Sequence, residues 1–315
     1  MNNNKKIAFL FPGQGSQYVG MGEEFLAADD EARSLIDKAD AISGYPIRKL
    51  CLEGPMEELT RTAHLQPAIT VQNLMALRGL TRAGINPDYV AGHSLGEYAA
   101  LCAAGVISED DTLRLVTERG RLMEREAEQN PGGMHAVLGL QIDEVLGIVA
   151  AVSDRGVLTA ANHNSEQQIV LSGELSALSA AAEIVAEKGG KAIPLKVSGA
   201  WHSALVSGAI EDFSAFMGGV SFSSPAIPLL FNVTAGEENE PQKIKEIMAR
   251  QIASTVRWYE IMNGLLSRGV GTFIEVGPKN VLTGLARKIL PRDHDCRLIQ
   301  IDSPEKIEAC RRELS

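Results

Sequence analysis

Residues 89–105 read YVAGHSLGEYAALCAAG, and this stretch decides the fold. Tyr89–Gly92 has the apolar pattern of a short buried strand, and the small residues after Gly96 predict a helix that starts at once. A GxSxG pattern between a strand and a helix permits a tight turn that lifts the serine side chain clear of the sheet. Free N–H groups at the helix start would face the serine oxygen. We therefore interpret Ser94 as a nucleophile; the alternative is an ordinary glycine-rich turn.

Strand and helix patterns alternate on both sides of this turn, which predicts an α/β fold with a largely parallel sheet. We expect Pro67 at the first position of a helix and Ser108 as the N-cap of another. The remaining strands of the sheet are expected at 7–11, 227–231 and 272–276, with one more near the end of the chain. The helices are expected at 67–84, 108–127, 203–217, 242–252, 258–267 and 281–289, with one more after the last strand.

The segment from about Gly133 to Val197 has a different order: strand, helix, strand, strand, helix, strand. This βαββαβ order is the signature of a ferredoxin-like unit. The expected ranges are 134–140, 143–154, 157–161, 168–172, 174–188 and 191–196. We therefore predict a ferredoxin-like small domain at residues 131–197, inserted into a catalytic domain made of residues 1–130 and 198–315.

Composition limits the possible functions. The chain has 315 residues, a formal net charge of −10, and 45% hydrophobic residues. The negative charge argues against a general binder of nucleic acid or anionic membranes, which needs clustered Lys and Arg. The apolar run before Pro12 is too short for a signal peptide or a membrane span. Four cysteines without close pairs, and histidine spacings wrong for zinc, indicate reduced thiols, no metal and a cytoplasmic location.

A second glycine loop, FPGQGSQ at residues 11–17, follows the first predicted strand. Tyr18 stands where a dinucleotide-binding loop needs Gly or Ala, and no GK[ST] follows, so both phosphate-loop interpretations fail. We expect either a loop beside Ser94 that supplies a backbone N–H or a simple turn. No cofactor is expected.

Six motifs in order carry a resemblance to a known family. They are FPGQGSQ, GHSLGEYAA, ERGRLM, ANHNS, GAWHS and EVGPKNVLTGL, between about residues 7 and 290. Together they resemble malonyl-CoA:acyl carrier protein transacylases and the acyltransferase domains of fatty acid and polyketide synthases. The resemblance implies an α/β-hydrolase-like large domain and a usually monomeric enzyme.

The resemblance also implies a ping-pong transfer. A malonyl group passes from malonyl-CoA to Ser94, and then to the phosphopantetheine thiol of an acyl carrier protein. His202 matches the catalytic base. Gln14 and Leu95 match positions whose backbone N–H groups form an oxyanion hole. Arg119 matches the arginine that binds the malonate carboxylate, and Gln251 matches a glutamine whose backbone carbonyl orients the histidine.

The residues by themselves leave some of these roles open. Any of the six histidines could serve Ser94, although His93 is expected to be structural because neighbours on a sharp turn point apart. Arg119 shares a helix face with Leu115, Leu122 and Met123, so it needs a partner. That partner is an internal carboxylate such as that of Glu126, or the carboxylate of a substrate, which arginine binds through two nitrogens.

Further expectations concern residues around the site and the surface that would meet the carrier protein. Trp201 stands where the family commonly has Phe, and its bulk should disfavour an α-methyl branch on the acyl group. Asn162 and Asn164 are expected to tie the small domain to loops near the site, and Asn232 to support Ser94 or His202. The candidates for a basic rim that would dock an acidic carrier protein are Lys188, Lys191, Lys196, Arg287 and Lys288.

Two other classes of function compete with transfer. An acyl hydrolase that strips carrier proteins would use the same serine but admit water, and a neutral acyl chain would give Arg119 no purpose. A non-catalytic scaffold would need neither Ser94, His202 nor Arg119. Whether the product enters fatty acid or polyketide synthesis is left open by the sequence.

Overall fold

The computed structural model describes residues 5–314, so residues 1–4 and Ser315 of the expected large domain lie outside the described residues. The main sheet has the strand order β7-β2-β1-β8-β9, and every paired neighbour is parallel. The predicted α/β fold with a parallel sheet is therefore confirmed. The strands are β1 (Lys6–Phe11), β2 (Tyr89–Gly92), β7 (Leu229–Leu230), β8 (Val270–Val276) and β9 (Arg297–Ile301).

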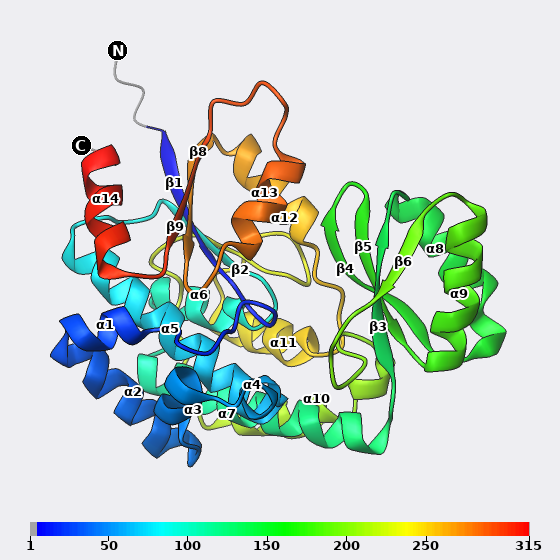
Figure 1. Cartoon of the computed structure of the whole chain (residues 1–315), viewed down its shortest axis with the longest axis horizontal. Helices are drawn as coiled ribbons and strands as arrows, with labels where there is room; N and C mark the ends of the chain where they lie inside the picture. Colours follow the sequence, from blue (N-terminus) through cyan, green and yellow to red (C-terminus); the bar gives the residue numbers. More distant parts are fainter. Residues whose placement is uncertain (1–4, 315) are drawn as a thin grey trace.

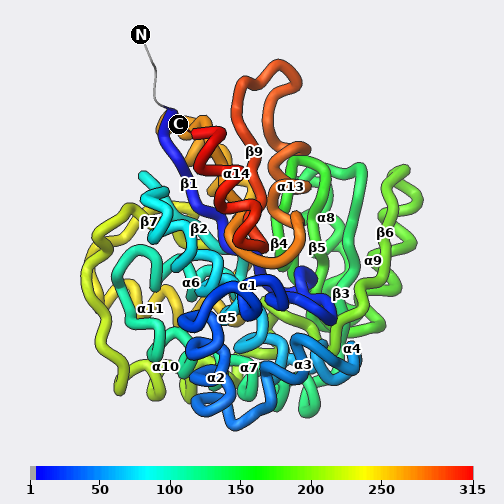
Figure 2. Tube along the Cα trace, turned by 60° about the vertical axis from the view of Figure 1, so that its left-hand side comes forward, coloured from blue at the N-terminus to red at the C-terminus, as the bar shows by residue number. Residues whose placement is uncertain are grey.

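Both faces of this sheet are buried, as expected for parallel strands with continuous apolar sequences. Alternate residues of β1 enter different cores: Phe9 and Phe11 pack in one cluster, and Ala8 and Leu10 in another. Figures 1 and 2 show helices on both sides of the sheet and the start of β1 near the end of α14. The helices are α1 (Glu23–Ala28), α2 (Asp30–Ser43), α3 (Ile47–Glu53), α4 (Met56–Thr60), α5 (Thr62–Arg82), α6 (Gly96–Ala103), α7 (Glu109–Gln129), η2 (Ala204–Val206), α10 (Ala209–Gly218), α11 (Pro241–Gln251), α12 (Trp258–Ser267), α13 (Val281–Ile289) and α14 (Pro304–Leu314).

The expected start of α5 was wrong. The helix begins at Thr62 and contains Pro67 in its interior. An interior proline removes one helical hydrogen bond, but the turn before it buries Ala63 and Leu65, and that burial offsets the loss. The expected start of α7 is confirmed, because the Ser108 side chain accepts the Asp111 N–H at 3.1 Å.

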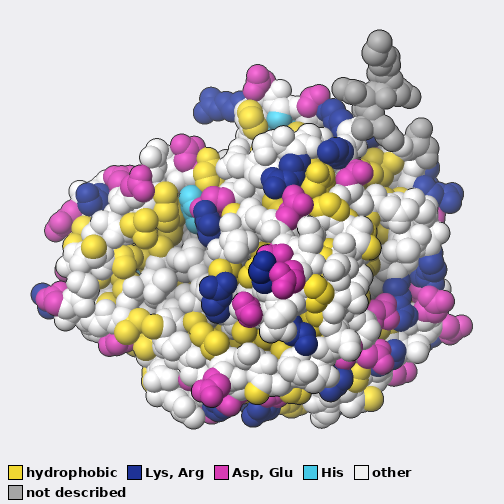
Figure 3. All heavy atoms as spheres, turned by 180° about the vertical axis from the view of Figure 1, so that it is seen from behind, with side chains coloured by type: hydrophobic (Ala, Val, Ile, Leu, Met, Phe, Trp, Pro, Cys, Tyr) yellow, Lys and Arg dark blue, Asp and Glu magenta, His cyan; other side chains and the backbone are white. Residues whose placement is uncertain are grey.

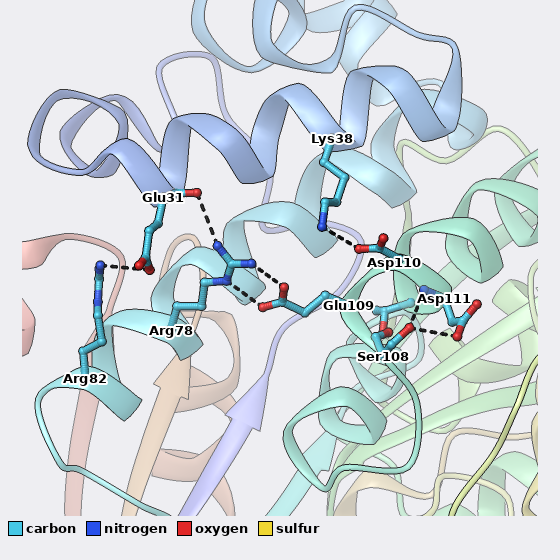
Figure 4. Close-up of polar contacts among 9 residues, drawn as sticks. Glu31, Lys38, Arg78, Arg82, Ser108, Glu109, Asp110 and Asp111 are labelled. Carbon is cyan, nitrogen blue, oxygen red and sulfur yellow. Dashed lines mark hydrogen bonds and ion pairs between the residues drawn. The ribbon is translucent and has the colours of Figure 1, made fainter.

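Ion pairs join α2, α5 and α7 on one side of the sheet (Figure 4). Arg78 of α5 donates through Nε to Glu109 of α7 at 2.7 Å, and Nη1 donates to the Glu31 carbonyl of α2 at 3.3 Å. Lys38 of α2 pairs with Asp110 at 2.7 Å. Each pair near the surface contributes about 0–1 kcal/mol, but together they join α2, α5 and α7, and the last two of these helices carry site residues.

The segment after α7 forms a separate antiparallel sheet with the strand order β4-β5-β3-β6. Figures 1 and 2 show it beside the main sheet. It has its own apolar cluster, which includes Val137, Ile148 and Leu178. The elements follow the predicted order: β3 (Gly133–Leu138), α8 (Ile142–Ala151), the short η1 (Ser153–Arg155), β4 (Leu158–Ser165), β5 (Gln168–Gly173), α9 (Leu175–Glu187) and β6 (Lys191–Pro194).

Strand β4 is longer than expected: it ends at Ser165 and not at Ala161, and it contacts residues outside the small sheet. Its additional residues bond to the segment before α12: His163 N–H donates to the Val256 carbonyl at 2.9 Å, and Val256 N–H donates to the Ala161 carbonyl at 2.8 Å. This connection holds Asn162 near the main sheet. Within residues 5–314, every helix is too short or too polar to cross a membrane.

Candidate active site

Ser94 occupies the predicted turn between β2 and α6. Its backbone has φ 50, in the left-handed region. The flanking glycines make the turn possible, because a methyl group at Gly96 would lie 1.9 Å from the Phe11 carbonyl oxygen and one at Gly92 would lie 2.1 Å from the Gly96 carbonyl carbon. Only glycine allows the backbone to approach this closely. The turn therefore presents the Ser94 side chain at the end of the sheet.

His202 lies against this serine. Its Nε2 atom is 2.7 Å from Ser94 Oγ, and its Nδ1 atom is 3.0 Å from the backbone oxygen of Gln251. A carbonyl oxygen can only accept, so Nδ1 carries the proton and Nε2 is free to accept the Ser94 hydroxyl proton. His202 also has a left-handed backbone, with φ 59. The expected helix at 203–217 is interrupted here, since η2 and α10 replace it.

The electrostatics of His202 favour its neutral form. Burial, followed by the nearby positive charge of Arg119, lowers the pKa of His202 to about 3, and the hydrogen bond to the Gln251 carbonyl opposes this shift only in part. At neutral pH the ring is therefore uncharged and able to accept a proton. The Gln251 carbonyl contacts Nδ1, the ring nitrogen that a carboxylate contacts in serine hydrolases.

Arg119 of α7 reaches the same serine, although it is only 1% exposed. Its Nη1 donates to Gln66 Oε1 at 2.9 Å, and its Nη2 donates to Gln251 Oε1 at 3.0 Å and to Ser94 Oγ at 3.2 Å. Among the described residues, its hydrogen-bond partners are thus neutral groups, and the expected alternative partner Glu126 binds Arg125 instead. Burial lowers the pKa of Arg119, and the nearby Tyr98 and Glu97 side chains oppose this.

The N-terminal glycine loop packs on the turn at Ser94. A methyl group at Gly13 would lie 2.5 Å from the His93 carbonyl oxygen and 3.4 Å from the Leu95 nitrogen. Gln14 and Leu95 both line a cavity of about 110 Å³ that also contains Ser94, Arg119 and His202. The other residues that line it are His93, Met123, Met134, Asn162, Leu195, Val197 and Trp201. The cavity therefore lies between the two sheets.

Asn232 supports Ser94 rather than His202. Its Oδ1 accepts the Ser94 backbone N–H at 2.7 Å, and its Nδ2 donates to the Gly92 carbonyl at 2.7 Å. It therefore holds both sides of the turn. His93 bonds through Nε2 to Asn164 Oδ1 at 2.8 Å and lies edge-on to Trp258, so it links the turn to β4. Asn162 lines the cavity from the same strand.

Two residues of this site were missed from the sequence. Gln66 holds Arg119, and the fully buried Glu97 bonds to Gln251 and Asn232. Gln66 gave no signal, because its partner is distant in sequence. Glu97 lies inside the GHSLGE stretch, but an acid in the first turn of a helix is already explained by the helix dipole.

The five basic candidates for carrier docking are all exposed. Lys288 donates to Gln168 Oε1 of the small sheet at 2.8 Å. On the face in Figure 3, Lys and Arg side chains lie beside Asp and Glu side chains. Within residues 5–314 there is no group of three or more His, Cys, Asp or Glu placed to hold a metal ion.

Comparison with known proteins agrees with this geometry. Residues 8–300 match the acyl transferase domain. A malonyl CoA-acyl carrier protein transacylase of Bacillus subtilis is 40% identical over 96% of this chain and 95% of its own length. The polyketide biosynthesis malonyl CoA-acyl carrier protein transacylase PksC of the same organism is 40% identical over 90% of this chain and 96% of its own length.

Solved structures give the same result. An acyl carrier protein S-malonyltransferase from Vibrio cholerae has a TM-score of 0.92 and 34% identity, covering 97% of this chain and 99% of that one. One from Burkholderia pseudomallei has a TM-score of 0.92 and 38% identity, covering 98% and 99%. The chain therefore belongs to the acyl transferase family that includes the malonyl CoA-acyl carrier protein transacylases.

Proposed function

We propose that this chain transfers a malonyl group from malonyl-CoA to the phosphopantetheine thiol of an acyl carrier protein, through a malonyl ester on Ser94. The observation that carries the proposal is that one hydroxyl contacts both a neutral histidine and a buried arginine. Ser94 Oγ is 2.7 Å from His202 Nε2 and 3.2 Å from Arg119 Nη2. The first contact suits proton transfer, and the second suits an acyl group that ends in a negative charge.

The first half-reaction begins when Ser94 Oγ attacks the thioester carbon while His202 Nε2 takes the hydroxyl proton. The carbonyl oxygen gains negative charge, which the backbone N–H groups of Gln14 and Leu95 stabilise. The carbon–sulfur bond then breaks, and His202 returns its proton to the departing sulfur of coenzyme A. The second half-reaction reverses these steps. His202 takes the proton of the carrier thiol, and the thiol sulfur attacks the ester carbon. The bond from that carbon to Ser94 Oγ then breaks, and Ser94 Oγ takes the proton back from His202.

Arg119 selects the acyl group. In the described site its two Nη atoms are held by the amide oxygens of Gln66 and Gln251, which are weaker partners than a carboxylate. A malonyl carboxylate that approaches the cavity would receive a charge-assisted bond from the same guanidinium. The nearly buried ring of Trp201 also lines the cavity, where its bulk disfavours an α-methyl branch.

Hydrolysis is the less favoured alternative. A hydrolase of neutral acyl chains would gain nothing from a charged guanidinium at the nucleophile, because an unpaired buried charge is costly. The relatives named above are transacylases or malonyltransferases, which also favours transfer.

Mass spectrometry of the protein mixed with malonyl-CoA alone tests the proposal. We expect a stable malonyl adduct on Ser94 that disappears when a carrier protein with its phosphopantetheine arm is added, and malonyl-carrier as the product. Ser94→Ala should give no adduct. Free malonate without an adduct would instead support hydrolysis.

We also propose the finer organisation of the chain. Residues 131–197 form a ferredoxin-like small domain, and residues 1–130 and 198–315 form an α/β-hydrolase-like domain. The βαββαβ order with its separate apolar cluster supports the first part, and the nucleophile between β2 and α6 supports the second. Four free cysteines within residues 5–314 fit a cytoplasmic location, and we propose that the chain acts as a monomer.

A further inference from the structure

Glu97 is a fully buried carboxylate behind the wall of the cavity. It belongs to the first turn of α6 and is 0% exposed. It is not among the residues that line the cavity, so it would not touch the acyl group. A buried acid is costly unless its oxygens are hydrogen-bonded, which makes its partners informative.

Both oxygens of Glu97 accept from N–H donors. The backbone N–H of Asn232 donates to Oε1 at 2.8 Å, and the side-chain Nε2 of Gln251 donates to Oε2 at 2.8 Å. Burial raises the pKa of Glu97 to about 7, while the two N–H donors and the charge of Arg119 act in the opposite direction. The pair of donors requires two acceptors, which a carboxylate offers and an amide does not.

The bond to Gln251 decides which way round its amide group lies. Nε2 of Gln251 donates one hydrogen to Glu97 and the other to the Ser94 carbonyl at 2.7 Å. With both hydrogens used in this way, Oε1 of Gln251 faces Arg119 and accepts from Nη2 at 3.0 Å. The backbone carbonyl of the same residue accepts from His202. One glutamine therefore contacts the nucleophile, the base and the arginine.

The bond to Asn232 acts on the turn itself. Glu97 fixes the Asn232 backbone, and the Asn232 side chain bridges the Ser94 N–H and the Gly92 carbonyl. Glu97 is thus linked to the turn at Ser94 through Asn232, and to Arg119 through Gln251.

We propose that Glu97 is a positioning residue that fixes the orientation of the Gln251 amide and so directs Arg119 toward the acyl carboxylate. The inference rests on the proposed function and deepens it. It differs from a packing role, because it predicts a loss of selectivity for an acyl group that carries a carboxylate.

Glu97→Gln keeps the size of the side chain and removes one acceptor. If the new NH2 group faces Gln251, the Gln251 amide must turn over and present its own NH2 group to Arg119, donor against donor. If it faces Asn232 instead, the turn that holds Ser94 is disturbed. Either arrangement should lower the malonyl-labelling rate of Ser94 at least tenfold, and the first should also lower the ratio of malonyl to acetyl labelling.

Glu275→Gln is the matched control. Glu275 is also 0% exposed, and its oxygens accept the N–H groups of Leu282 and Thr283 at 2.9 and 2.7 Å. Burial raises its pKa to about 7, as for Glu97. The control loses the same kind of hydrogen bond at the start of α13, so it should lower the melting temperature similarly and leave the labelling ratio unchanged.

Gln251→Met approaches the same contact from the other partner. It removes the side-chain amide and keeps the backbone carbonyl that His202 uses, so it should lower the labelling ratio while acetyl labelling continues. In the double variant with Glu97→Gln the two effects on the ratio should not multiply, because both act through one amide. This measurement also serves if Glu97→Gln does not fold, since Gln251→Met alone must then change the ratio.

The rates of Ser94 labelling by malonyl-CoA and acetyl-CoA, measured by mass spectrometry beside melting temperatures, decide the matter. A wild-type malonyl-labelling rate in Glu97→Gln would overturn the proposal, as would a wild-type ratio in Gln251→Met or effects on the ratio that multiply in the double variant. If the unmodified chain forms no malonyl adduct, the proposed function itself fails. The two failures are therefore distinct.

Discussion

Arg119→Lys tests the recognition of the acyl carboxylate. Lysine keeps the positive charge but concentrates it on one nitrogen, whereas Arg119 spreads three hydrogen bonds over two nitrogens. Loss of one contact to a charged group costs about 1.5–3 kcal/mol. At about 1.4 kcal/mol per tenfold in rate, malonyl labelling of Ser94 should fall by roughly 10- to 150-fold. Acetyl labelling, which involves no carboxylate, should change by less than about threefold.

The assay is the initial rate of Ser94 labelling with malonyl-CoA and with acetyl-CoA under the same conditions. Arg121→Lys is the control, because Arg121 lies on the same helix but is exposed and pairs with Glu118. It should leave both rates near wild type. Equal losses for the two acyl groups in Arg119→Lys would show that the arginine supports the nucleophile or the fold and does not recognise the carboxylate.

Three further predictions concern the base and the turn. His202→Ala should slow both half-reactions by about 10²–10⁴-fold in single-turnover measurements, and an unchanged acylation rate would exclude it as the base. Because the pKa of His202 is lowered to about 3, the unfolded chain takes up a proton near pH 6.5 that the folded chain does not. The free energy of unfolding should therefore fall as the pH drops from about 6.5 toward 3, by up to about 1.4 kcal/mol per pH unit. Urea unfolding at pH 7 and pH 5 should show a smaller difference in His202→Ala, and equal differences would contradict the shift. Gly96→Ala, which places a methyl 1.9 Å from the Phe11 carbonyl oxygen, should destabilise the fold by about 1–3 kcal/mol. Gly218→Ala, where the added methyl meets open space, is the control, and similar urea midpoints for the two variants would refute the argument.

The parts of the fold that follow local rules were predictable. The strand at Tyr89–Gly92 and the helix at Val281–Ile289 have the expected bounds, since apolar pattern and glycine positions determine them directly. Pro67 was expected at the start of a helix, but α5 begins at Thr62, because the turn before the proline is stabilised by the burial of Ala63 and Leu65. The longer β4 depends on backbone bonds to Val256, a contact that strand length in the sequence does not reveal.

The site residues also fall into two groups, those set by local sequence and those set by contacts between distant segments. Ser94 stands in a motif whose geometry is local, so the sequence alone indicated it. His202, Arg119 and Gln251 converge only when distant helices and loops fold together, and the family resemblance was needed to select them. Glu97 was hidden because its two partners, Asn232 and Gln251, are remote in sequence.

The left-handed backbone at Ser94 limits the chemistry that engineering can introduce there. Threonine would keep a hydroxyl, but a β-branched residue is a true outlier at φ 50. Cysteine matches the shape of serine and fits the same turn. The turn thus accommodates Ser94→Cys but not Ser94→Thr. A redesigned catalyst would therefore carry the acyl group as a thioester on cysteine.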